Sequence, residues 1–400
     1  MSGSSYLSAN EPFGPIGIIG HTANTDFIQS VNKVLSAKRQ KRVEQNAGPY
    51  INSPGYYRSD YVIDSSLVRF QTGEGKFTLG ESVRGHDIFI ITDVLSHNLT
   101  HRLTVGEHVI SADDHYRDLL RIVSTCMGKA RRVNVIMPFV YEGRREKLDS
   151  HRESYDCADM LKQLYDLGIS KLIMFDPHDG RIANAVPLMD IEMPRCQYKI
   201  TSTLINRFGS ISLDRSNTMV VSPDEMGVSR AILYASTLNL PLGIFYRDRD
   251  YTVKVNGEHP IKNFRFLGDD VSGKDILLID DMINSGNTML RTARKLKDLG
   301  AADIYCLSPY GLFTDGLTAF DNCAAEGIIK AVCCTNLIYR TPELLSRTWY
   351  VDADMVPYVA RIIDAINIDE SVYDLINSTA RLESLNRQIR LGEIFDEFND

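Results

Sequence analysis

Short apolar runs alternate with helix-like segments along most of the chain, and this alternation limits the possible folds more than any other feature. The clearest runs have the length of single strands, and several of them end in Asp, Pro or Gly. They are VNVIMPFV, KLIMFD, TMVVSPD, LGIFYRD, DILLIDD, DIYCLSP and KAVCCTN. Strands that alternate with helices form mainly parallel sheets with helices on both faces. The sequence therefore predicts an α/β fold, in which ligands bind at the carboxyl ends of the strands.

Two segments have the periodicity of helices that bury one face. DDHYRDLLRIVSTCMGKA begins with acidic residues, which favour the amino end of a helix. GNTMLRTARKLKDLG has apolar residues on one face and ends in Gly300, which suits the carboxyl end of a helix. The apolar residues on that face are Met289, Leu290, Ala293, Leu296 and Leu299.

The chain has 400 residues, enough for two domains of ordinary size. LYDLGISKLIMFDP, from Leu164, resembles LKDLGAADIYCLSP, from Leu296. Both combine a helix end, a glycine, a strand and a proline, which indicates either two copies of one α/β unit or a local pattern that recurs by chance. We expect an N-terminal extension with a first strand and helix over residues 1–60, α/β domains over 61–200 and 201–345, and a helical tail over 346–400.

Composition excludes several classes of protein. Hydrophobic residues make up 44% of the chain and charged residues 24%, as in ordinary globular proteins. The net charge of −8 argues against a general nucleic-acid-binding protein, because that function needs clustered cations. No apolar run reaches the roughly 20 residues of a membrane-spanning helix. The opening MSGSSYLSANEPFG lacks the basic and apolar regions of a signal peptide, so we expect a cytoplasmic protein.

Several features favour structural roles over chemical ones. The seven cysteines have no metal-type spacing and fit reduced thiols, and Cys333 with Cys334 is expected inside a buried strand. The basic stretches SAKRQKR and MGKARR are interpreted as solvated helix faces. The spacing of His97, His101 and His108 fits no metal-binding template.

The stretch DILLIDDMINSGNTML, from Asp275, places three chemically different features in one loop. A buried strand ends in Asp280 and Asp281, and a turn then leads into a helix. That turn has hydroxyl and amide donors and a glycine that lets backbone approach a ligand, next to the unpaired N–H groups of the helix start. The turn consists of Asn284, Ser285, Gly286, Asn287 and Thr288.

This arrangement suits a pentose 5-phosphate. The turn can hold the phosphate, while Asp280 and Asp281 would repel the phosphate but accept hydrogen bonds from the sugar hydroxyls. The alternative is a purely structural strand end, in which an aspartate pair is followed by an Asn-Ser-Gly turn. The residues of this loop leave both interpretations open.

The loop resembles the ribose-5-phosphate loop of the type I phosphoribosyltransferase fold, which phosphoribosyltransferases share with ribose-phosphate diphosphokinases (PRPP synthetases). RFQTGEGKFTLGESVRGHDIFII resembles the N-terminal segment of the PRPP synthetases, in which Phe70 and Glu74 match residues that reach the adenine site of a neighbouring subunit. Thr72 replaces an aspartate that is usual there. GRREKLDSHRES resembles the Arg-Gln-Asp loop that binds ATP: Arg144 matches its arginine, while Arg145 and Glu146 replace the other two residues.

Two further motifs resemble the metal and diphosphate sites of that family. FDPHDG matches an Asp-Leu-His motif, with His178 in the place of the metal-binding histidine. VVSPDEMGVSRA matches the pyrophosphate loop, with Asp224 as the metal-linked aspartate. That loop consists of Asp224, Glu225, Met226 and Gly227, and Met226 is bulkier than the glycine usual at its position.

The family stabilises the transferring group with a mobile Lys-Arg-Arg loop that follows a strand. FYRDRDYT occupies that place here: Arg247 stands for the lysine, Asp248 for the middle arginine and Arg249 for the last. An arginine is planar and bidentate where a lysine is a point charge, so the two are not equivalent. The alternative is a solvated turn in which these arginines pair with neighbouring aspartates.

The resemblance covers roughly residues 60 to 345 and is nearest to a longer bacterial subclass of PRPP synthetases. It implies two tandem phosphoribosyltransferase-like (Rossmann-like) domains, with mainly parallel sheets flanked by helices. It implies an enzyme that transfers the diphosphoryl group of ATP to the 1-hydroxyl of ribose 5-phosphate, with Mg²⁺ as cofactor. It also implies a homo-oligomer, a dimer or hexamer with a shared ATP site, and no membrane or nucleic-acid partner.

Three other functions remain open at this point. The departures at Arg145, Arg247 and Asp248 are compatible with a catalytically weak or regulatory subunit. The altered ATP loop is compatible with a diphosphokinase that acts on a larger acceptor built on ribose 5-phosphate. A phosphoribosyltransferase is disfavoured, since such an enzyme would have one such domain and lack this N-terminal half.

Overall fold

The computed structural model describes residues 11–20, 25–104, 106–145, 152–209, 211–249 and 261–391, without the side chains of 247–249, 261–263 and 389–391. The chain forms two compact units. The first comprises Met1–Arg195, Leu337–Tyr339 and Met355–Asn377. The second comprises Cys196–Asn336, Arg340–Asp354 and Ser378–Asp400. None of the helices in the described ranges is long and apolar enough to cross a membrane.

The first unit is built on a five-stranded parallel sheet with the order β1-β4-β7-β8-β9. The strands are β1 (Ile16–Gly20), β4 (Asp87–Ile91), β7 (Arg132–Ile136), β8 (Lys171–Ile173) and β9 (Asp190–Glu192). Every residue of β4 and β7 is buried, as expected for central strands covered on both faces. Its helices are α1 (Thr25–Glu44), α2 (Ala112–Cys126), α3 (Asp156–Asp166), α9 (Val356–Asn367) and α10 (Tyr373–Ile376), with the 3₁₀ turn η2 (Gly180–Ala185).

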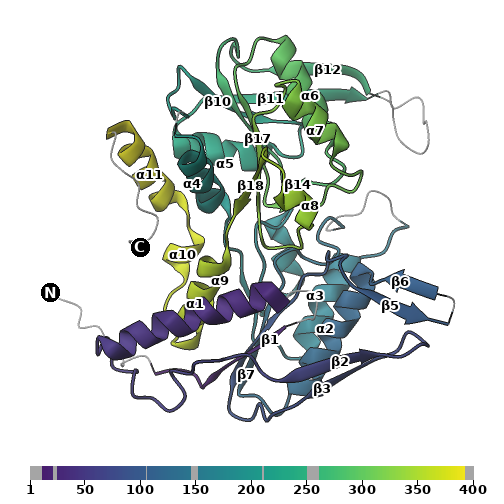
Figure 1. Ribbon diagram of the computed structural model, residues 1–400, viewed down its shortest axis with the longest axis vertical. Helices are drawn as coiled ribbons and strands as arrows, with labels where there is room; N and C mark the ends of the chain where they lie inside the picture. The colour runs from purple at the N-terminus through teal and green to yellow at the C-terminus, as the bar shows by residue number, and fades with distance from the viewer. Residues whose placement is uncertain are drawn as a thin grey trace. The chain divides into compact units, whose positions relative to one another are not determined.

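Two antiparallel hairpins accompany this sheet: β2 (Ser65–Arg69) with β3 (Gly75–Leu79), and β5 (Thr100–Leu103) with β6 (Gly106–Val109). Figure 1 shows the first hairpin as a long ribbon and the second as a shorter one. In β2 and β3 exposed and half-buried residues alternate, so each strand has one face toward the unit and one toward solvent.

The second unit contains a seven-stranded sheet with the order β12-β11-β10-β13-β15-β17-β18. Its strands run parallel except for the edge strand β12, which is antiparallel to β11. They are β10 (Thr218–Ser222), β11 (Leu242–Arg249), β12 (Ile261–Leu267), β13 (Asp275–Ile279), β15 (Ile304–Leu307), β17 (Ala331–Thr335) and β18 (Tyr350–Ala353). A two-stranded pair, β14 (Met282–Ile283) and β16 (Tyr310–Gly311), continues beyond β13 and β15.

Helices flank this sheet as well (Figure 1). They are α4 (Gln197–Arg207), α5 (Val228–Leu238), α6 (Asn287–Asp298), α7 (Thr318–Ala325), α8 (Pro342–Leu345) and α11 (Thr379–Leu391). Both units are thus α/β structures with mostly parallel sheets, as predicted. All the strands named from the sequence are present, because strands buried on both faces are continuous apolar runs that need no periodicity to be recognised.

The two predicted helices are also present as α2 and α6. A capping box starts α2: the Ser111 hydroxyl accepts a hydrogen bond from the Asp114 N–H at 3.1 Å, and the Asp114 carboxylate accepts one from the Ser111 N–H at 3.1 Å. In α6 the prediction fails for Leu299, which is 38% exposed. The helix ends at Asp298, and Gly300 turns the chain with φ +90°, so Leu299 lies beyond the buried stripe.

The tail was expected to be helical, but it begins with β18, which pairs with β17. The helices α9, α10 and α11 follow. The apolar residues of Tyr350–Ala353 complete the edge of the sheet, where pairing to a neighbouring strand outweighs helix propensity. All seven cysteines are free and buried, and Cys333 and Cys334 lie inside β17 as predicted.

The basic stretch of α1 is not a solvated face, contrary to prediction. The Arg39 side chain is fully buried, and its Nε donates to Asp364 Oδ1 at 2.9 Å. Lys38 Nζ and Arg42 Nη1 each lie 2.9 Å from Asp364 Oδ2. Asp364 belongs to α9, which packs beside α1 (Figure 1). A buried carboxylate between three cations explains why these residues are basic.

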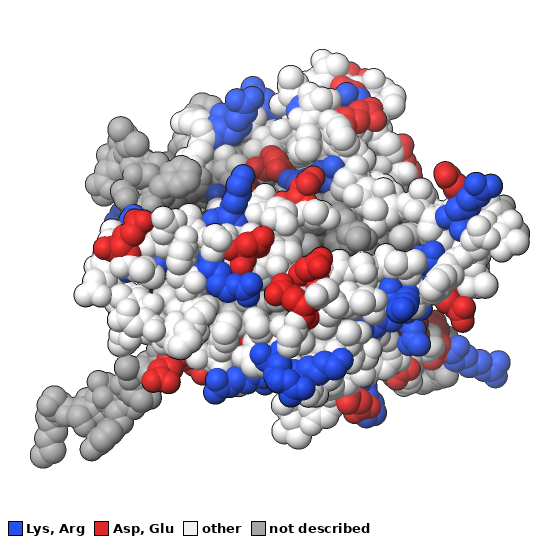
Figure 2. Space-filling view, turned by 60° about the horizontal axis from the view of Figure 1, so that its bottom comes forward, with Lys and Arg blue, Asp and Glu red and all other residues white. Residues whose placement is uncertain are grey.

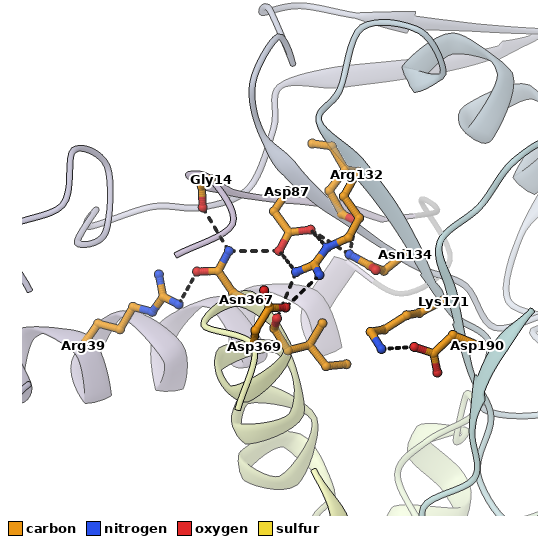
Figure 3. A network of polar contacts seen from close by, with 11 residues as sticks. Gly14, Arg39, Asp87, Arg132, Asn134, Lys171, Asp190, Asn367 and Asp369 are labelled. Atoms are coloured by element: carbon orange, nitrogen blue, oxygen red, sulfur yellow. Dashed lines mark hydrogen bonds and ion pairs between the residues drawn. The ribbon is translucent and has the colours of Figure 1, made fainter. Parts of the chain in front are cut away.

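The prediction also fails for Arg132 in the second basic stretch. Its Nε and Nη2 donate to the two oxygens of Asp87 at 2.8 and 2.6 Å, and Asn367 Nδ2 donates to Asp87 Oδ2 at 2.9 Å (Figure 3). Asn367 in turn accepts from Arg39 Nη2 at 2.7 Å. Asp87 and Arg132 are the first residues of their strands. This network therefore closes the amino end of the first unit's sheet.

Candidate functional site

Two loops meet at the carboxyl end of the second sheet, where β10 and β13 are neighbours. The loop after β10 contains Asp224 to Gly227, and the loop after β13 begins with Asp280. A methyl group on Gly227 would lie 2.9 Å from Ser222 Oγ and 3.6 Å from the Ile279 carbonyl oxygen. The predicted pyrophosphate loop and the predicted ribose-5-phosphate loop are therefore adjacent, as parallel pairing of their strands requires.

Asp224 organises the first of these loops. Its Oδ1 accepts hydrogen bonds from the N–H groups of Met226 at 2.9 Å and Gly227 at 3.1 Å. Its carbonyl oxygen accepts one from the Ser222 hydroxyl at 2.7 Å. Met226 is 54% exposed, so the bulkier side chain points away from the packed interior. The turn is held from within by its own aspartate, and α5 begins directly after it.

The pKa of Asp280 depends on burial and on the charges of both loops. Burial raises the pKa of Asp280 well above its ordinary range, and the negative charges of Asp281 and Asp224 raise it further. The Asp281 N–H donates to Asp280 Oδ1 at 2.8 Å, and the Asp280 N–H donates to the Leu307 carbonyl at 3.0 Å. A cation or a hydroxyl donor at this point would favour the ionised form of Asp280.

The turn that starts α6 depends on Gly286. Its φ is +83°, and a methyl group there would lie 2.3 Å from Phe320 Cζ. Phe320 is fully buried on α7 and stacks on Trp349 with a centroid distance of 5.5 Å. Only glycine fits this position without a clash, and it has no side chain that could cap the first N–H groups of α6.

The rest of the turn is held by its neighbours. The Thr314 N–H donates to the Asn284 carbonyl at 3.0 Å, and the Ser285 hydroxyl accepts from the Asn287 N–H at 3.4 Å. Asn287 Nδ2 donates to Asp315 Oδ2 at 3.3 Å. The Asn287 amide therefore points at Asp315 in this structure, while the hydroxyl of Ser285 remains at the helix start.

In the first unit, Phe70 and Glu74 lie at the tip of the β2–β3 hairpin. The Phe70 N–H donates to the Glu74 carbonyl at 2.8 Å, and the Gly73 N–H donates to the Phe70 carbonyl at 2.9 Å. Phe70 is 49% exposed, and Glu74 is exposed as well. A large aromatic ring on a hydrogen-bonded tip is well suited to contact a ligand or a second subunit.

The loop after β7 carries Arg144 and Arg145, both exposed. The Arg145 N–H donates to the Glu142 carbonyl at 2.8 Å, which closes the turn. Tyr141, at the start of this loop, stacks on Tyr116 of α2 with a centroid distance of 4.5 Å and donates to Asp113 Oδ1 at 2.6 Å. The arginines therefore project from a loop whose base is anchored to α2.

His178 lies in the loop after β8, directly before η2. The Phe175 N–H in that loop donates to the Pro138 carbonyl at 3.0 Å, so the loops after β7 and β8 are joined at the carboxyl end of the first sheet. The hydrogen bond from the Arg181 side chain lowers the pKa of Asp179 and, together with the positive charge of Arg181, outweighs the opposite effect of burial. His178 belongs to the first unit and Asp224 to the second.

The described residues contain no group of three His, Cys, Asp or Glu side chains placed to chelate a metal. A single carboxylate such as Asp224 still fits Mg²⁺, which prefers oxygen ligands and usually keeps several waters and substrate oxygens. The catalytic candidates Arg247 and Arg249 lie at the end of β11, and their side chains are outside the described residues.

A groove of about 450 Å³ runs between α2 and α3 and contains none of the predicted site residues. It is lined by Arg117, Leu120, Arg121, Ser124, Gln163, Asp166 and Leu167. On the face drawn in Figure 2, Lys and Arg side chains form one band across the lower middle and several smaller groups among acidic and uncharged side chains. The expected absence of a nucleic-acid partner stays a prediction.

Sequence reasoning missed three residues that shape the site. The ring of Phe320 leaves no room for a side chain at Gly286. The Ser222 hydroxyl donates to the Asp224 carbonyl and so supports that turn. Arg69 forms an ion pair with Asp118 that holds the hairpin tip. Phe320 carried no signal, since it is one apolar residue of a helix. Arg69 directly precedes Phe70, and this position next to a predicted site residue is the only signal for Arg69 in the sequence.

Three known domain families match the chain. The N-terminal domain of ribose phosphate pyrophosphokinase matches residues 16–168. The phosphoribosyl transferase domain matches residues 192–311, and the phosphoribosyl synthetase-associated domain matches residues 252–376.

Relatives of the same kind are similar over most of the chain. A Streptococcus mutans protein named "Putative ribose-phosphate pyrophosphokinase 2" is 26% identical over 290 residues, which are 72% of this chain and 80% of that one. The ribose-phosphate pyrophosphokinase of Parasynechococcus marenigrum is 28% identical over 272 residues, 68% of this chain and 73% of that one. The crystal structure of phosphoribosylpyrophosphate synthetase from Mycobacterium smegmatis has the same fold: its TM-score is 0.68 at 21% identity, over 88% of this chain and 98% of that one.

Proposed function

Because the chain belongs to the ribose-phosphate pyrophosphokinase family, we propose that it transfers the diphosphoryl group of ATP to the 1-hydroxyl of ribose 5-phosphate. The products are PRPP and AMP. The observation that carries this proposal is the adjacency of two loops in the second unit. One places the carboxylates of Asp280 and Asp281 before a helix start, and the other presents the Asp224 turn.

Ribose 5-phosphate fits the loop after β13 in one orientation. Its phosphate binds the N–H groups at the start of α6 and the hydroxyls of Ser285 and Thr288. Its ring hydroxyls donate to Asp280 and Asp281, which would repel the phosphate in the reverse orientation. Asn284 and Asn287 complete the turn, and Gly286 keeps it open to the ligand.

The transfer forms a bond between the 1-oxygen of the sugar and the β-phosphorus of ATP. The bond between the β-phosphorus and the oxygen that bridges to the α-phosphate breaks, so AMP leaves with that oxygen and the sugar hydroxyl loses its proton. Charge spreads over the phosphate oxygens in the transition state, and cations must stabilise it. We assign this role to Arg247 and Arg249.

The Asp224 to Gly227 turn, with Glu225 and Met226 between its ends, borders the diphosphoryl group. Mg²⁺ held by Asp224 would neutralise the phosphate oxygens, and His178 is the metal-binding candidate of the first unit. Arg144 and Arg145 contact ATP, and the tip residues Phe70 and Glu74 contact its adenine. The exposed ring of Phe70 suits the site of a second copy of the chain, which supports a homo-oligomer.

The test is a product assay with purified protein, ATP, Mg²⁺ and ribose 5-phosphate. Equal amounts of AMP and PRPP are expected, and Asp281→Asn should lower their rate because a hydroxyl contact is weakened. Formation of ADP would show γ-phosphoryl transfer and refute the proposal. No turnover, combined with protection from unfolding by ribose 5-phosphate, would favour a regulatory subunit. Lys330→Met, which removes only an exposed ion pair with Asp303, serves as the matched control.

A further inference from the structure

The tip of the β2–β3 hairpin is held by a buried ionic clamp at its base. Asp118 of α2 is fully buried, although it carries a carboxylate. Arg69, the last residue of β2, binds Asp118 through Nη2, and Arg121 Nη1 lies 2.5 Å from the other carboxylate oxygen. One buried anion therefore lies between two guanidinium groups, which satisfies it electrostatically.

The clamp reaches directly into the tip. Arg69 Nη1 donates to the Gly73 carbonyl at 3.1 Å and to Asp114 Oδ1 at 3.2 Å. Gly73 has φ +89° and lies between Phe70 and Glu74, whose backbones are hydrogen-bonded to each other. The same guanidinium thus binds α2 on one side and the turn of the tip on the other.

A second support comes from the β5–β6 hairpin. The N–H and the hydroxyl of Thr104 both lie 3.3 Å from the Gln71 carbonyl oxygen, which accepts from them. Gly75 at the start of β3 is packed against the clamp, since a methyl group there would lie 2.8 Å from Arg121 Nη1. The turn from Gln71 to Gly75 is therefore contacted from two sides.

These contacts are not needed to attach the hairpin to the unit. Phe77 and Leu79 of β3 already pack against the apolar core. What the clamp adds is a fixed direction for the turn, at the end where Phe70 and Glu74 are exposed. Such ordering in advance lowers the conformational entropy that the tip would otherwise lose when a ligand binds.

We propose that Asp118, with Arg69 and Arg121, positions Phe70 and Glu74 for nucleotide binding. The three are positioning residues, since they act through the tip and do not contact the nucleotide. This inference rests on the proposed function, in which the tip contacts adenine. It predicts that ATP affinity depends on Asp118, Arg69 and Arg121, although these three residues do not contact ATP themselves.

Arg69→Met tests the inference by equilibrium binding of ATP and of ribose 5-phosphate. The variant keeps the Asp118–Arg121 pair and the apolar stem of the side chain. We expect ATP affinity to fall about tenfold while ribose-5-phosphate affinity changes by less than about twofold. Arg69→Lys keeps the charge but not the fork geometry, so a smaller loss of about threefold is expected.

Hydrogen exchange provides the readout of tip order. Amide exchange at residues 70–75 should accelerate in Arg69→Met, while exchange in β4 and β7 stays slow. Lys162→Met is the control, because it removes an exposed ion pair with Asp166 on the neighbouring helix. It should change neither exchange at the tip nor ATP binding.

Faster exchange at the tip with unchanged ATP affinity would overturn the inference, and so would unchanged exchange with weakened ATP binding. If Arg69→Met does not fold, Asp118→Asn decides by the same two measurements, since it keeps the shape of the side chain. Wild-type protein that binds ATP but forms no PRPP would refute the proposed function alone, and the clamp would still be judged by ATP binding.

Discussion

Gly286→Ala is the substitution whose cost can be worked out most fully from the structure. The φ of +83° disfavours any residue with a Cβ by about 1 kcal/mol. The new methyl group would lie 2.3 Å from Phe320 Cζ, well inside the contact distance of about 3.5–4.0 Å between carbon atoms. Phe320 cannot move aside, because it is fully buried between Phe313 at 4.9 Å and Trp349 at 5.5 Å.

Overpacking of this kind costs about 1–3 kcal/mol, so the total expected loss is about 2–4 kcal/mol. Gly316→Ala is a matched control, since Gly316 has φ +82° and nothing lies within 4 Å of the place that its methyl group would take. That variant should lose only the conformational part, about 1 kcal/mol. The difference between the two variants therefore isolates the clash with Phe320.

Urea unfolding monitored by tryptophan fluorescence measures this difference. Trp349 is the only tryptophan of the chain, and it belongs to the second unit and stacks on Phe320. The Gly286→Ala transition should move to clearly lower urea than the Gly316→Ala transition. Equal stability of the two variants would refute the packing argument. Phe320→Leu should make Gly286→Ala less costly than it is alone, because it removes ring atoms from the clash.

Three further predictions concern charge. The pKa of Asp280 is raised, so ionisation of this carboxyl destabilises the ligand-free protein as pH rises through that pKa. Asp280→Asn should therefore raise the melting temperature at pH 8 more than at pH 5. The same variant should weaken ribose-5-phosphate binding in titrations. Asp364→Asn should cost about 3–5 kcal/mol in urea unfolding, because Arg39 loses its buried partner. Arg247→Met should lower kcat far more than it weakens ribose-5-phosphate binding, as steady-state kinetics with binding titrations would measure; equal losses would contradict its transition-state role.

The direction in which Asp364 changes stability with pH follows from the charges around it. Burial alone would raise its pKa, but the charges of Arg39, Lys38 and Arg42 outweigh burial and hold the pKa below the ordinary value. Its contribution to stability is therefore complete above about pH 4, the ordinary pKa of an aspartate, and is lost as pH falls through the lowered pKa. Wild-type protein should lose stability in that acid range, and Asp364→Asn should lose less of it.

The strands could be predicted because parallel strands buried on both faces are continuous apolar runs. The loop at Asp280 could be predicted because its donors, acceptors and glycine are consecutive in the chain. Arg39 could not be assigned correctly, since its partner Asp364 is 325 residues away and a basic helix stretch is usually solvated. The clamp at Asp118 was missed for the same reason, as Arg69 lies 49 residues from it.

Packing in three dimensions also explains why residue 286 is glycine. The sequence indicates a turn there, but only the ring of Phe320 shows why no Cβ is tolerated. The convergence of Asp224 with Asp280 likewise follows from the order of strands in the sheet, since β10 and β13 are neighbours there although β11 and β12 lie between them in the chain. A local sequence pattern does not indicate which distant segments of the chain will pair in the sheet.

The central claim is that the β-phosphorus of ATP is attacked by the sugar hydroxyl. ATP labelled with ¹⁸O in the bridge between the α- and β-phosphates tests this directly, with mass spectrometry of the products formed from ribose 5-phosphate and Mg²⁺. The proposed mechanism predicts that AMP carries the bridge label and that PRPP carries none. ADP that retains the label, or PRPP that contains it, would contradict the mechanism.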